Sequence, residues 1–272
     1  MLDLWNPWEI YDRLIEQIDP SVQVTASGRF GKWAFIENSE AGAGMAFHMP
    51  VESIARRLPT DPSGMSLREV AAYAKSWNFA EAALGMAAVN SWYALPSRAE
   101  AAGFVPCQVN NWQNLFDPWS AEVAGNRVAV IGHFPFAAAA LSAASELFIF
   151  ERNVLDGDLP DTAAEYVLPT CDYVFITGSA FVNKTMPRLL ELSRSAQTII
   201  VGPSAPAATL LTEYGVNSLT TFSTTDIASF QPALGGQRLG ACTRPVGVSS
   251  STPSLRGVIA PHLGDAGSVV TR

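Results

Sequence analysis

The feature of the sequence that most constrains the fold is a regular alternation of strand-like and helix-like segments between residues 127 and 215. Each strand-like segment is a short, continuous run of apolar residues. Apolar strands that alternate with helices are typical of a parallel sheet covered on both faces. The predicted strands are 127–132, 146–151, 173–178 and 198–203, and the predicted helices are 136–144, 162–169, 185–196 and 208–215.

The first half of the chain has a different pattern. Apolar residues at helical spacing predict a helix over residues 8–18. Gly28 and Gly31 are expected to bracket a turn, and two short apolar segments, 32–37 and 42–49, then read as a hairpin. Two further helices are expected. The first covers 66–75, where Ser66 and Glu69 form a capping-box pattern, and the second is the alanine-rich segment 79–93.

Residues 94–126 contain proline, asparagine and tryptophan with little periodicity, so we place the domain boundary there. The prediction is a small N-terminal α/β domain over 1–110 and a Rossmann-like parallel-sheet domain over 120–240. Residues 241–272 are rich in Gly, Ser, Pro and Thr, and this composition predicts a flexible tail.

Charge and composition exclude several classes of protein. The chain has 17 Lys and Arg against 25 Asp and Glu, a net charge of −8, which argues against a nucleic-acid binder. No apolar run reaches the roughly 18 residues that a membrane span needs. The N-terminus lacks the basic start of a signal peptide, and three scattered cysteines do not make a disulfide framework. We therefore expect a cytoplasmic protein that binds neither nucleic acid nor membrane.

In an open parallel sheet, ligands bind outside the carboxyl ends of the strands. Gly132, Gly178 and Gly202 each close a predicted strand at that edge. Glycine there lets a ligand approach the backbone, although a tight strand-to-helix turn needs glycine equally often. The GxGxxG motif is absent, so an ordinary dinucleotide-binding turn is not supported, and the residues indicate no particular cofactor.

Glu151 ends the second predicted strand, where an acid can accept hydrogen bonds from ribose hydroxyls. The alternative is a salt bridge to Arg152 or Arg127. Both interpretations remain open at this stage.

Three polar residues follow the later strands: Ser179, Asn183 and Ser204. Their hydroxyl and amide groups can bind a phosphate or carboxylate at a helix start. They can equally cap the helix, which is the commoner role.

His133 directly follows the first glycine of the sheet, where it can act as a base or as a metal ligand. The three histidines lie far apart in the sequence, and no CxxC or HxxxH pair exists. A metal site would need ligands from distant segments, with His133 and Cys107 or Cys171 as the candidates. We therefore expect no dedicated metal site, and His133 is the residue to hold a metal if there is one.

Two further groups of polar residues lie in the first half and in the boundary region. Glu81 and Asn90 lie on one predicted helix, about 2.5 turns apart. Asn110, Asn111 and Asn114 surround Trp112 near the expected boundary, where clefts between domains favour ligands. Loop residues that cap backbone groups are an equally good interpretation of this cluster.

Several motifs in the second half, GHFPF, IFERN, DLPDTAAEYVLP, FITGSAFVNKT and VGPSAPAATLLTEYGVNSL, resemble the DUF364 family, which is labelled for heavy-metal chelation. In the first half, SWNFAEAALGMAAVN and GKWAF resemble the DUF4213 domain. The resemblance covers about residues 8–235. It implies an N-terminal α/β domain similar to the enolase N-terminal fold, followed by a Rossmann-like domain. The family-like positions are Gly132, His133, Pro135, Glu151, Arg152, Asp158, Pro160, Gly178, Ser179, Asn183, Gly202, Pro203 and Ser204.

The function expected from the residues is binding or processing of a small anionic molecule, nucleotide-like or metal-bearing, at the carboxyl edge of the sheet. Backbone amides and hydroxyls outnumber soft metal ligands at that edge. The alternatives are a metal-handling protein, as the family label implies, and a scaffold. Seven tryptophans could supply the scaffold's interface, including one between copies of the chain. The sequence does not decide whether the protein is an enzyme.

Overall fold

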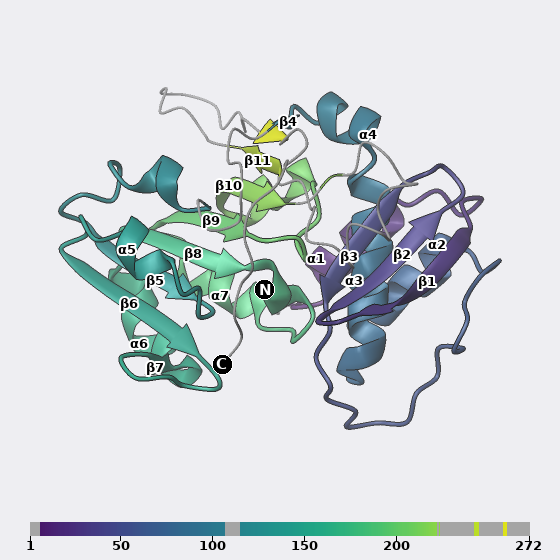
Figure 1. Cartoon of the computed structure of the whole chain (residues 1–272), viewed down its shortest axis with the longest axis horizontal. Helices are drawn as coiled ribbons and strands as arrows, with labels where there is room; N and C mark the ends of the chain where they lie inside the picture. Colours follow the sequence, from purple (N-terminus) through teal and green to yellow (C-terminus); the bar gives the residue numbers. More distant parts are fainter. Residues whose placement is uncertain (1–5, 107–114, 222, 224–241, 245–257, 260–272) are drawn as a thin grey trace, which may run out of the picture.

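The computed structural model describes residues 6–106, 115–221, 223, 242–244 and 258–259. Two sheets lie side by side in it, a small antiparallel one from the first half of the chain and a larger, mainly parallel one from the second (Figure 1). We call residues 6–104 the antiparallel unit and residues 115–221 the parallel unit. The α/β fold expected from the sequence is confirmed, whereas the likeness to enolase stays a prediction.

The antiparallel unit is a three-stranded sheet covered by a long helix, α3. The predicted hairpin and the predicted helix over 79–93 are confirmed. The predicted turn at Gly28 is wrong, because Gly28 lies inside a strand opposite Phe35, and only Gly31 lies in the turn. The elements are α1 (Glu9–Glu16), β1 (Val24–Phe30), β2 (Trp33–Asn38), β3 (Ala43–Phe47), α2 (Leu67–Ala71), the 3₁₀ helix η1 (Ala72–Lys75), α3 (Phe79–Tyr93) and α4 (Pro96–Ala101).

Helix α3 can lie close against β3 because small residues face each other. A Cβ added to Gly44 would stand 2.1 Å from the backbone nitrogen of Ser91, so only glycine fits there. The helix starts at a true cap, since the Asn78 side chain accepts hydrogen bonds from the backbone of Ala80 and Glu81. The predicted capping box is wrong, because the Ser66 hydroxyl donates instead to the Pro20 carbonyl.

The parallel unit contains six parallel strands in the order β10-β9-β8-β5-β6-β7. All four predicted strands are present, and β7 and β10 are additional. Two short antiparallel strands, β11 and β12, continue the sheet beyond β10, and β4 pairs with β11. The strands are β4 (Val105–Pro106), β5 (Arg127–Ile131), β6 (Glu146–Glu151), β7 (Leu159–Pro160), β8 (Tyr173–Thr177), β9 (Gln197–Val201), β10 (Val216–Thr221), β11 (Cys242–Arg244) and β12 (Val258–Ile259).

The helices that connect these strands are shorter than the sequence predicts. The segment 136–144 is helical over only four residues, and 208–215 forms a 3₁₀ helix that ends at Gly215 in the left-handed conformation. The helical elements are η3 (Asp117–Trp119), α5 (Ala137–Ala140), η4 (Asp161–Ala163), α6 (Ala164–Val167), η5 (Leu168–Thr170), η6 (Gly178–Phe181), α7 (Met186–Leu192) and η7 (Thr209–Tyr214). Among the described residues, no helix combines the length and apolarity that crossing a membrane requires.

The two faces of the parallel sheet belong to different hydrophobic cores. Val128 and Val130 of β5 point into a core with Trp119 and Leu141. Ala129, between them in the strand, belongs to the other core, which also contains α6, α7 and most of the antiparallel unit. Since this second core is continuous across the two units, they are packed as one body over that face of the sheet.

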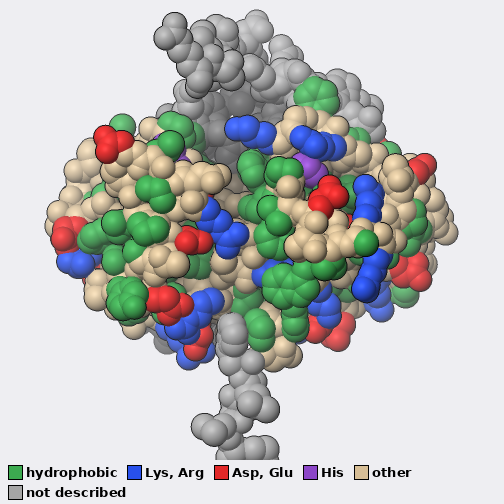
Figure 2. Space-filling view, turned by 90° about the horizontal axis from the view of Figure 1, so that it is seen from below, with side chains coloured by type: hydrophobic (Ala, Val, Ile, Leu, Met, Phe, Trp, Pro, Cys, Tyr) green, Lys and Arg blue, Asp and Glu red, His purple; other side chains and the backbone are tan. Residues whose placement is uncertain are grey.

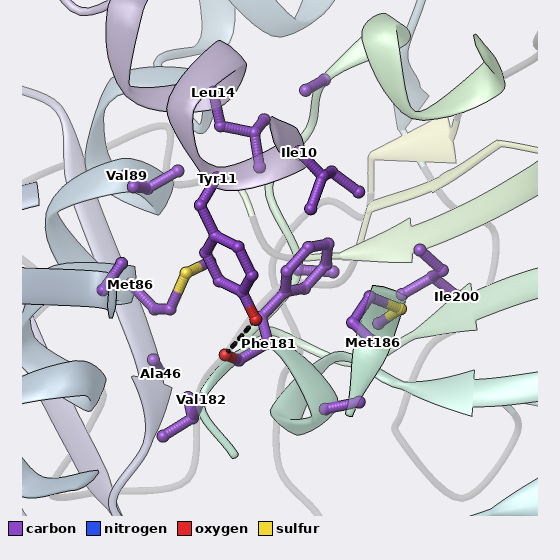
Figure 3. Packing of buried hydrophobic residues seen from close by; sticks show 14 of the residues in the cluster. Ile10, Tyr11, Leu14, Ala46, Met86, Val89, Phe181, Val182, Met186 and Ile200 are labelled. Carbon is purple, nitrogen blue, oxygen red and sulfur yellow. Dashed lines mark hydrogen bonds between the residues drawn. The ribbon is translucent and has the colours of Figure 1, made fainter. Parts of the chain in front are cut away.

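Figure 3 shows how α1 closes this shared core. Tyr11 points from α1 toward η6, and its buried hydroxyl donates a hydrogen bond to the Phe181 carbonyl at 2.7 Å. The two aromatic rings meet edge to face with their centroids 5.9 Å apart. Burial raises the pKa of the Tyr11 hydroxyl far above its usual range, so it stays protonated and keeps its donor.

We expect Tyr11→Phe to lower the free energy of unfolding by about 1–2 kcal/mol, because it leaves the buried Phe181 carbonyl without its donor. Urea denaturation of the whole chain measures this. Tyr166→Phe is the matched control, since the side chain of Tyr166 is 84% exposed and should change stability little. Equal unfolding free energies for Tyr11→Phe and the wild type would contradict the role given to this contact.

Candidate functional site

The carboxyl ends of the parallel strands bring most of the predicted site residues to one edge of the sheet. Gly132 follows β5, Glu151 ends β6, Gly178 follows β8 and Gly202 follows β9. In Figure 1 this edge faces the antiparallel unit. That unit covers only part of the edge, and this divides the predicted residues into two groups.

The end of β9 is covered by the antiparallel unit. The Ser204 hydroxyl accepts a hydrogen bond from the backbone of Phe47 in β3 at 2.8 Å, and Ser204 is only 2% exposed. Asn90 of α3 donates to the carbonyls of Pro203 at 3.2 Å and Met45 at 2.7 Å. Its Oδ1 is buried and has no hydrogen-bond partner among the described residues. In this arrangement Ser204 and the Pro203 carbonyl hold the two units together, and Ser204 and the buried Gly202 offer little surface to a ligand.

The end of β8 is more open. The hydroxyls of Thr177 and Ser179 are hydrogen-bonded to each other at 3.0 Å, and both residues are partly exposed. Gly178 between them is buried against the β9 loop, where an added Cβ would lie 2.6 Å from the Ala205 nitrogen. Asn183 caps the turn that precedes α7, because its Oδ1 accepts hydrogen bonds from the backbone and hydroxyl of Thr185. Of these residues, Ser179 is the one best placed to meet a ligand.

Glu151 holds the backbone around the end of β5 and β6. One carboxylate oxygen accepts a hydrogen bond from the His133 amide at 3.0 Å, and the other accepts one from the Arg152 amide at 2.8 Å. The alternative of a salt bridge to Arg152 or Arg127 is wrong, because the side chain of Arg152 pairs with Asp161 and that of Arg127 pairs with Glu146. Glu151 therefore fixes the turn that carries His133.

His133 forms a dyad with Asp158. The imidazole Nδ1 lies 3.0 Å from both carboxylate oxygens, and the Asp158 side chain is 2% exposed. The carboxylate also accepts a hydrogen bond from the Leu155 amide at 3.1 Å. A carboxylate accepts but does not donate, so Nδ1 carries the proton in this pair. In the sequence Asp158 is only a family-like position, and its spacing of 25 residues from His133 gives no local sign of the contact.

This arrangement leaves the second ring nitrogen of His133 available. The side chain is 28% exposed, and Nε2 has no hydrogen-bond partner among the described residues. An imidazole held through Nδ1 by a carboxylate presents Nε2 as an acceptor. That atom can take a proton from a bound molecule or bind a metal.

The hydroxyl pair and the dyad lie at the ends of adjacent strands, because Thr177 ends β8 and His133 follows β5. Gly132, which precedes His133, lies beside Thr177, since a Cβ added there would lie 3.2 Å from that side chain. We call His133, Glu151, Asp158, Thr177 and Ser179 the His133 site. It combines an oriented imidazole with two partly exposed hydroxyls at the ends of adjacent strands.

Metal ligands do not gather elsewhere in the part of the chain that is described. No group of three or more His, Cys, Asp or Glu side chains there could hold a metal ion. Cys171 is buried, its thiol donates to the Val167 carbonyl, and burial raises the pKa of that thiol. Cys107 and His262 lie outside the described residues, as does the predicted cluster of Asn110, Asn111, Trp112 and Asn114.

Glu81, the other acid singled out from the sequence, has a structural role. It is 1% exposed, and its carboxylate accepts hydrogen bonds from the Leu58 amide at 2.6 Å, the Ser76 hydroxyl at 2.7 Å and the Arg57 amide. Burial alone would raise the pKa of Glu81, but these hydrogen bonds outweigh it and hold the pKa below its usual value. Glu81 therefore anchors the loop before α2 as an anion.

Two family models match the chain in order. Residues 11–93 match DUF4213 and residues 114–237 match DUF364, and both models carry the description "Putative heavy-metal chelation". A curated relative from Methanocaldococcus jannaschii, "Uncharacterized protein MJ0500", is 29% identical over 144 residues, which are 52% of this chain and 53% of the relative. The chain thus spans about half the length of that relative.

Two solved structures are similar over most of the chain. A DUF364-family protein with unknown function from Desulfitobacterium hafniense is 36% identical, with a TM-score of 0.76, covering 86% of this chain and 93% of the other. A DUF364-family protein from Pyrococcus horikoshii, PH1506, is 24% identical with a TM-score of 0.62, covering 84% of this chain and 92% of the other, and it supports the fold alone. The family resemblance expected from the sequence is confirmed.

Proposed function

The chain belongs to the DUF364 family, and from this premise and the geometry around His133 we propose that it binds or processes a small anionic molecule, nucleotide-like or metal-bearing, at the His133 site. The observation that carries the proposal is the dyad, in which a buried carboxylate fixes one nitrogen of an imidazole and leaves the other free. Burying a carboxylate costs free energy unless it is paired, and here its partner is the ring of a side chain that is 28% exposed.

The chemistry of the site suits a ligand that has both an anionic group and an exchangeable proton. The Thr177 and Ser179 hydroxyls can donate hydrogen bonds to a phosphate or carboxylate. Nε2 of His133 can accept a proton from a ligand hydroxyl or a water, and the resulting imidazolium would be stabilised by Asp158. On the face drawn in Figure 2, Lys and Arg are interspersed with Asp and Glu, so that face offers a large anionic polymer no extended basic surface.

We expect His133→Gln to weaken the binding of such a ligand at least tenfold, about 1.4 kcal/mol. A thermal-shift screen of nucleotides and other small anions selects the ligand, and calorimetric titration gives the affinity. Ser204→Ala is the control, because it removes the contact between the units and should lower stability without changing affinity. Equal affinity for His133→Gln and the wild type would reject the site.

Metal handling is the second candidate function, favoured by the family description and by one feature of the dyad. Histidines that bind metals commonly donate their other ring N–H to a carboxylate, as His133 does to Asp158. Against it, no group of three or more His, Cys, Asp or Glu side chains among the described residues could hold a metal ion. A metal at Nε2 would therefore have to take its other ligands from the bound molecule or from outside the described residues.

Elemental analysis of dialysed protein tests this alternative. We expect less than about 0.1 equivalent of zinc per chain, since a structural zinc site requires four ligands. His133→Gln supplies the control for any metal that is found. One equivalent of tightly held metal that disappears in His133→Gln would favour the metal-handling function over the first proposal.

A further inference from the structure

An anionic ligand needs more positive charge than the His133 site contains. Glu151 and Asp158 both contribute carboxylates to the site, and the adjacent cation, Arg152, is paired with Asp161. Carboxylates repel an anion placed beside them unless cations from another element also face that anion. The additional charge must therefore come from a different part of the chain.

The turn between β1 and β2 lies at the same edge of the parallel sheet. We call residues 29–32, with the sequence Arg-Phe-Gly-Lys, the hairpin tip. The Lys32 carbonyl accepts a hydrogen bond from the His48 amide at 2.7 Å. The residue before His48 is Phe47, whose amide donates to Ser204 after β9. Strand β3 also contacts η6, the segment that follows β8, so the hairpin tip is held at the carboxyl edge of the sheet.

The hairpin tip carries two exposed cations, Arg29 and Lys32. Neither forms an ion pair with the described residues. Arg29 donates from Nε to the Gly31 carbonyl at 3.1 Å, which uses one of its five N–H donors. Its charge lies close to the end of β3, because it adds to burial in lowering the pKa of His48, against the opposite effect of Glu52. Two cations are thus available at the edge where the anion is expected.

An aromatic side chain lies between these two cations in the sequence. Phe30 is 47% exposed, and its neighbour on the opposite strand is Trp33. The rings of Trp33 and Phe47 are partly exposed as well and meet edge to face with their centroids 5.8 Å apart. An aromatic ring exposed to water is a surface on which a planar heteroaromatic ring can stack. The hairpin tip therefore combines positive charge with an aromatic face.

We propose, on the basis of the proposed function, that the hairpin tip is the second half of the His133 site and that the ligand is a nucleoside phosphate. Arg29 and Lys32 bind the phosphate groups, and the Ser179 hydroxyl donates to them from the parallel unit. Phe30 packs against the base. Such a ligand contacts both units, and its affinity falls with added salt because the cations are exposed.

Calorimetric titration with ADP, inorganic pyrophosphate and adenosine tests the proposal. Pyrophosphate has the charged groups without the ring, and adenosine has the ring without the charge, so we expect ADP to bind more tightly than either. Lys32→Gln should weaken both ADP and pyrophosphate at least about threefold, because it removes a charge that faces the phosphates. Phe30→Ala should weaken ADP at least about fivefold and leave pyrophosphate unchanged, because only the base stacks on the ring.

Each substitution has a matched control elsewhere on the surface. Arg194→Gln removes an exposed cation that precedes β9 and so lies at the opposite edge of the sheet. Tyr166→Ala removes a ring that is 84% exposed on α6. Neither control should change the affinity for ADP.

The outcomes separate this inference from the proposed function. Wild-type affinity for ADP in both Lys32→Gln and Phe30→Ala would overturn the role of the hairpin tip. If His133→Gln still lost the ligand in that case, the proposed function would stand without it. Failure of ADP to bind the wild type would overturn the nucleoside-phosphate assignment, and the thermal-shift screen with other anions would then decide the proposed function by itself.

Discussion

The antiparallel unit is seated on the carboxyl end of β9, and the rest of the structure depends on this constraint. The contact between the units consists of hydrogen bonds from a side chain of one unit to the backbone of the other. Asn90 donates to the Pro203 carbonyl, and the Ser204 hydroxyl accepts from the Phe47 amide. Tyr11 adds a third such contact at Phe181. Backbone groups that are buried between the two units must be hydrogen-bonded. These contacts therefore determine which loops of the parallel unit are covered and how those loops are oriented.

One consequence is that fewer strand ends at the carboxyl edge of the sheet are open to a ligand. A parallel sheet offers all of its carboxyl ends to a ligand in principle, but here the β9 loop is used to hold the molecule together. The polar groups that remain lie at β5, β6 and β8. At these ends, Glu151 uses its oxygens to hold the His133 turn, and Asp158 uses its own to hold the imidazole. Glu151 thus fixes the backbone of His133, and Asp158 fixes its imidazole ring.

The sequence predicts the parallel sheet well because its strands are continuous apolar runs, as in β5 and β8. It misses β7, which is two residues long and contains a proline, and it overestimates α5, which alanine propensity alone would have made longer. Helix propensity is a weak guide where a short connection limits the helix.

The site residues show the same distinction between positions that the local sequence predicts and contacts that it does not. Glu151 ends β6 and His133 follows β5, so topology alone places them at the edge. The partnership of His133 with Asp158 depends on the path of the loop before β7, and the burial of Ser204 depends on how the antiparallel unit docks. Both are long-range contacts that leave no pattern in the local sequence.

The most direct measurement of the central claim is a long-range ¹H–¹⁵N correlation spectrum of the histidine side chains, of which the chain has three. It is recorded at about pH 9, well above the ordinary pKa of an imidazole. The dyad predicts that His133 carries its proton on Nδ1, that Asp158→Asn changes this signal, and that the anion selected by thermal shift moves it. A His133 ring protonated on Nε2, with a signal that neither Asp158→Asn nor the anion affects, would contradict the account.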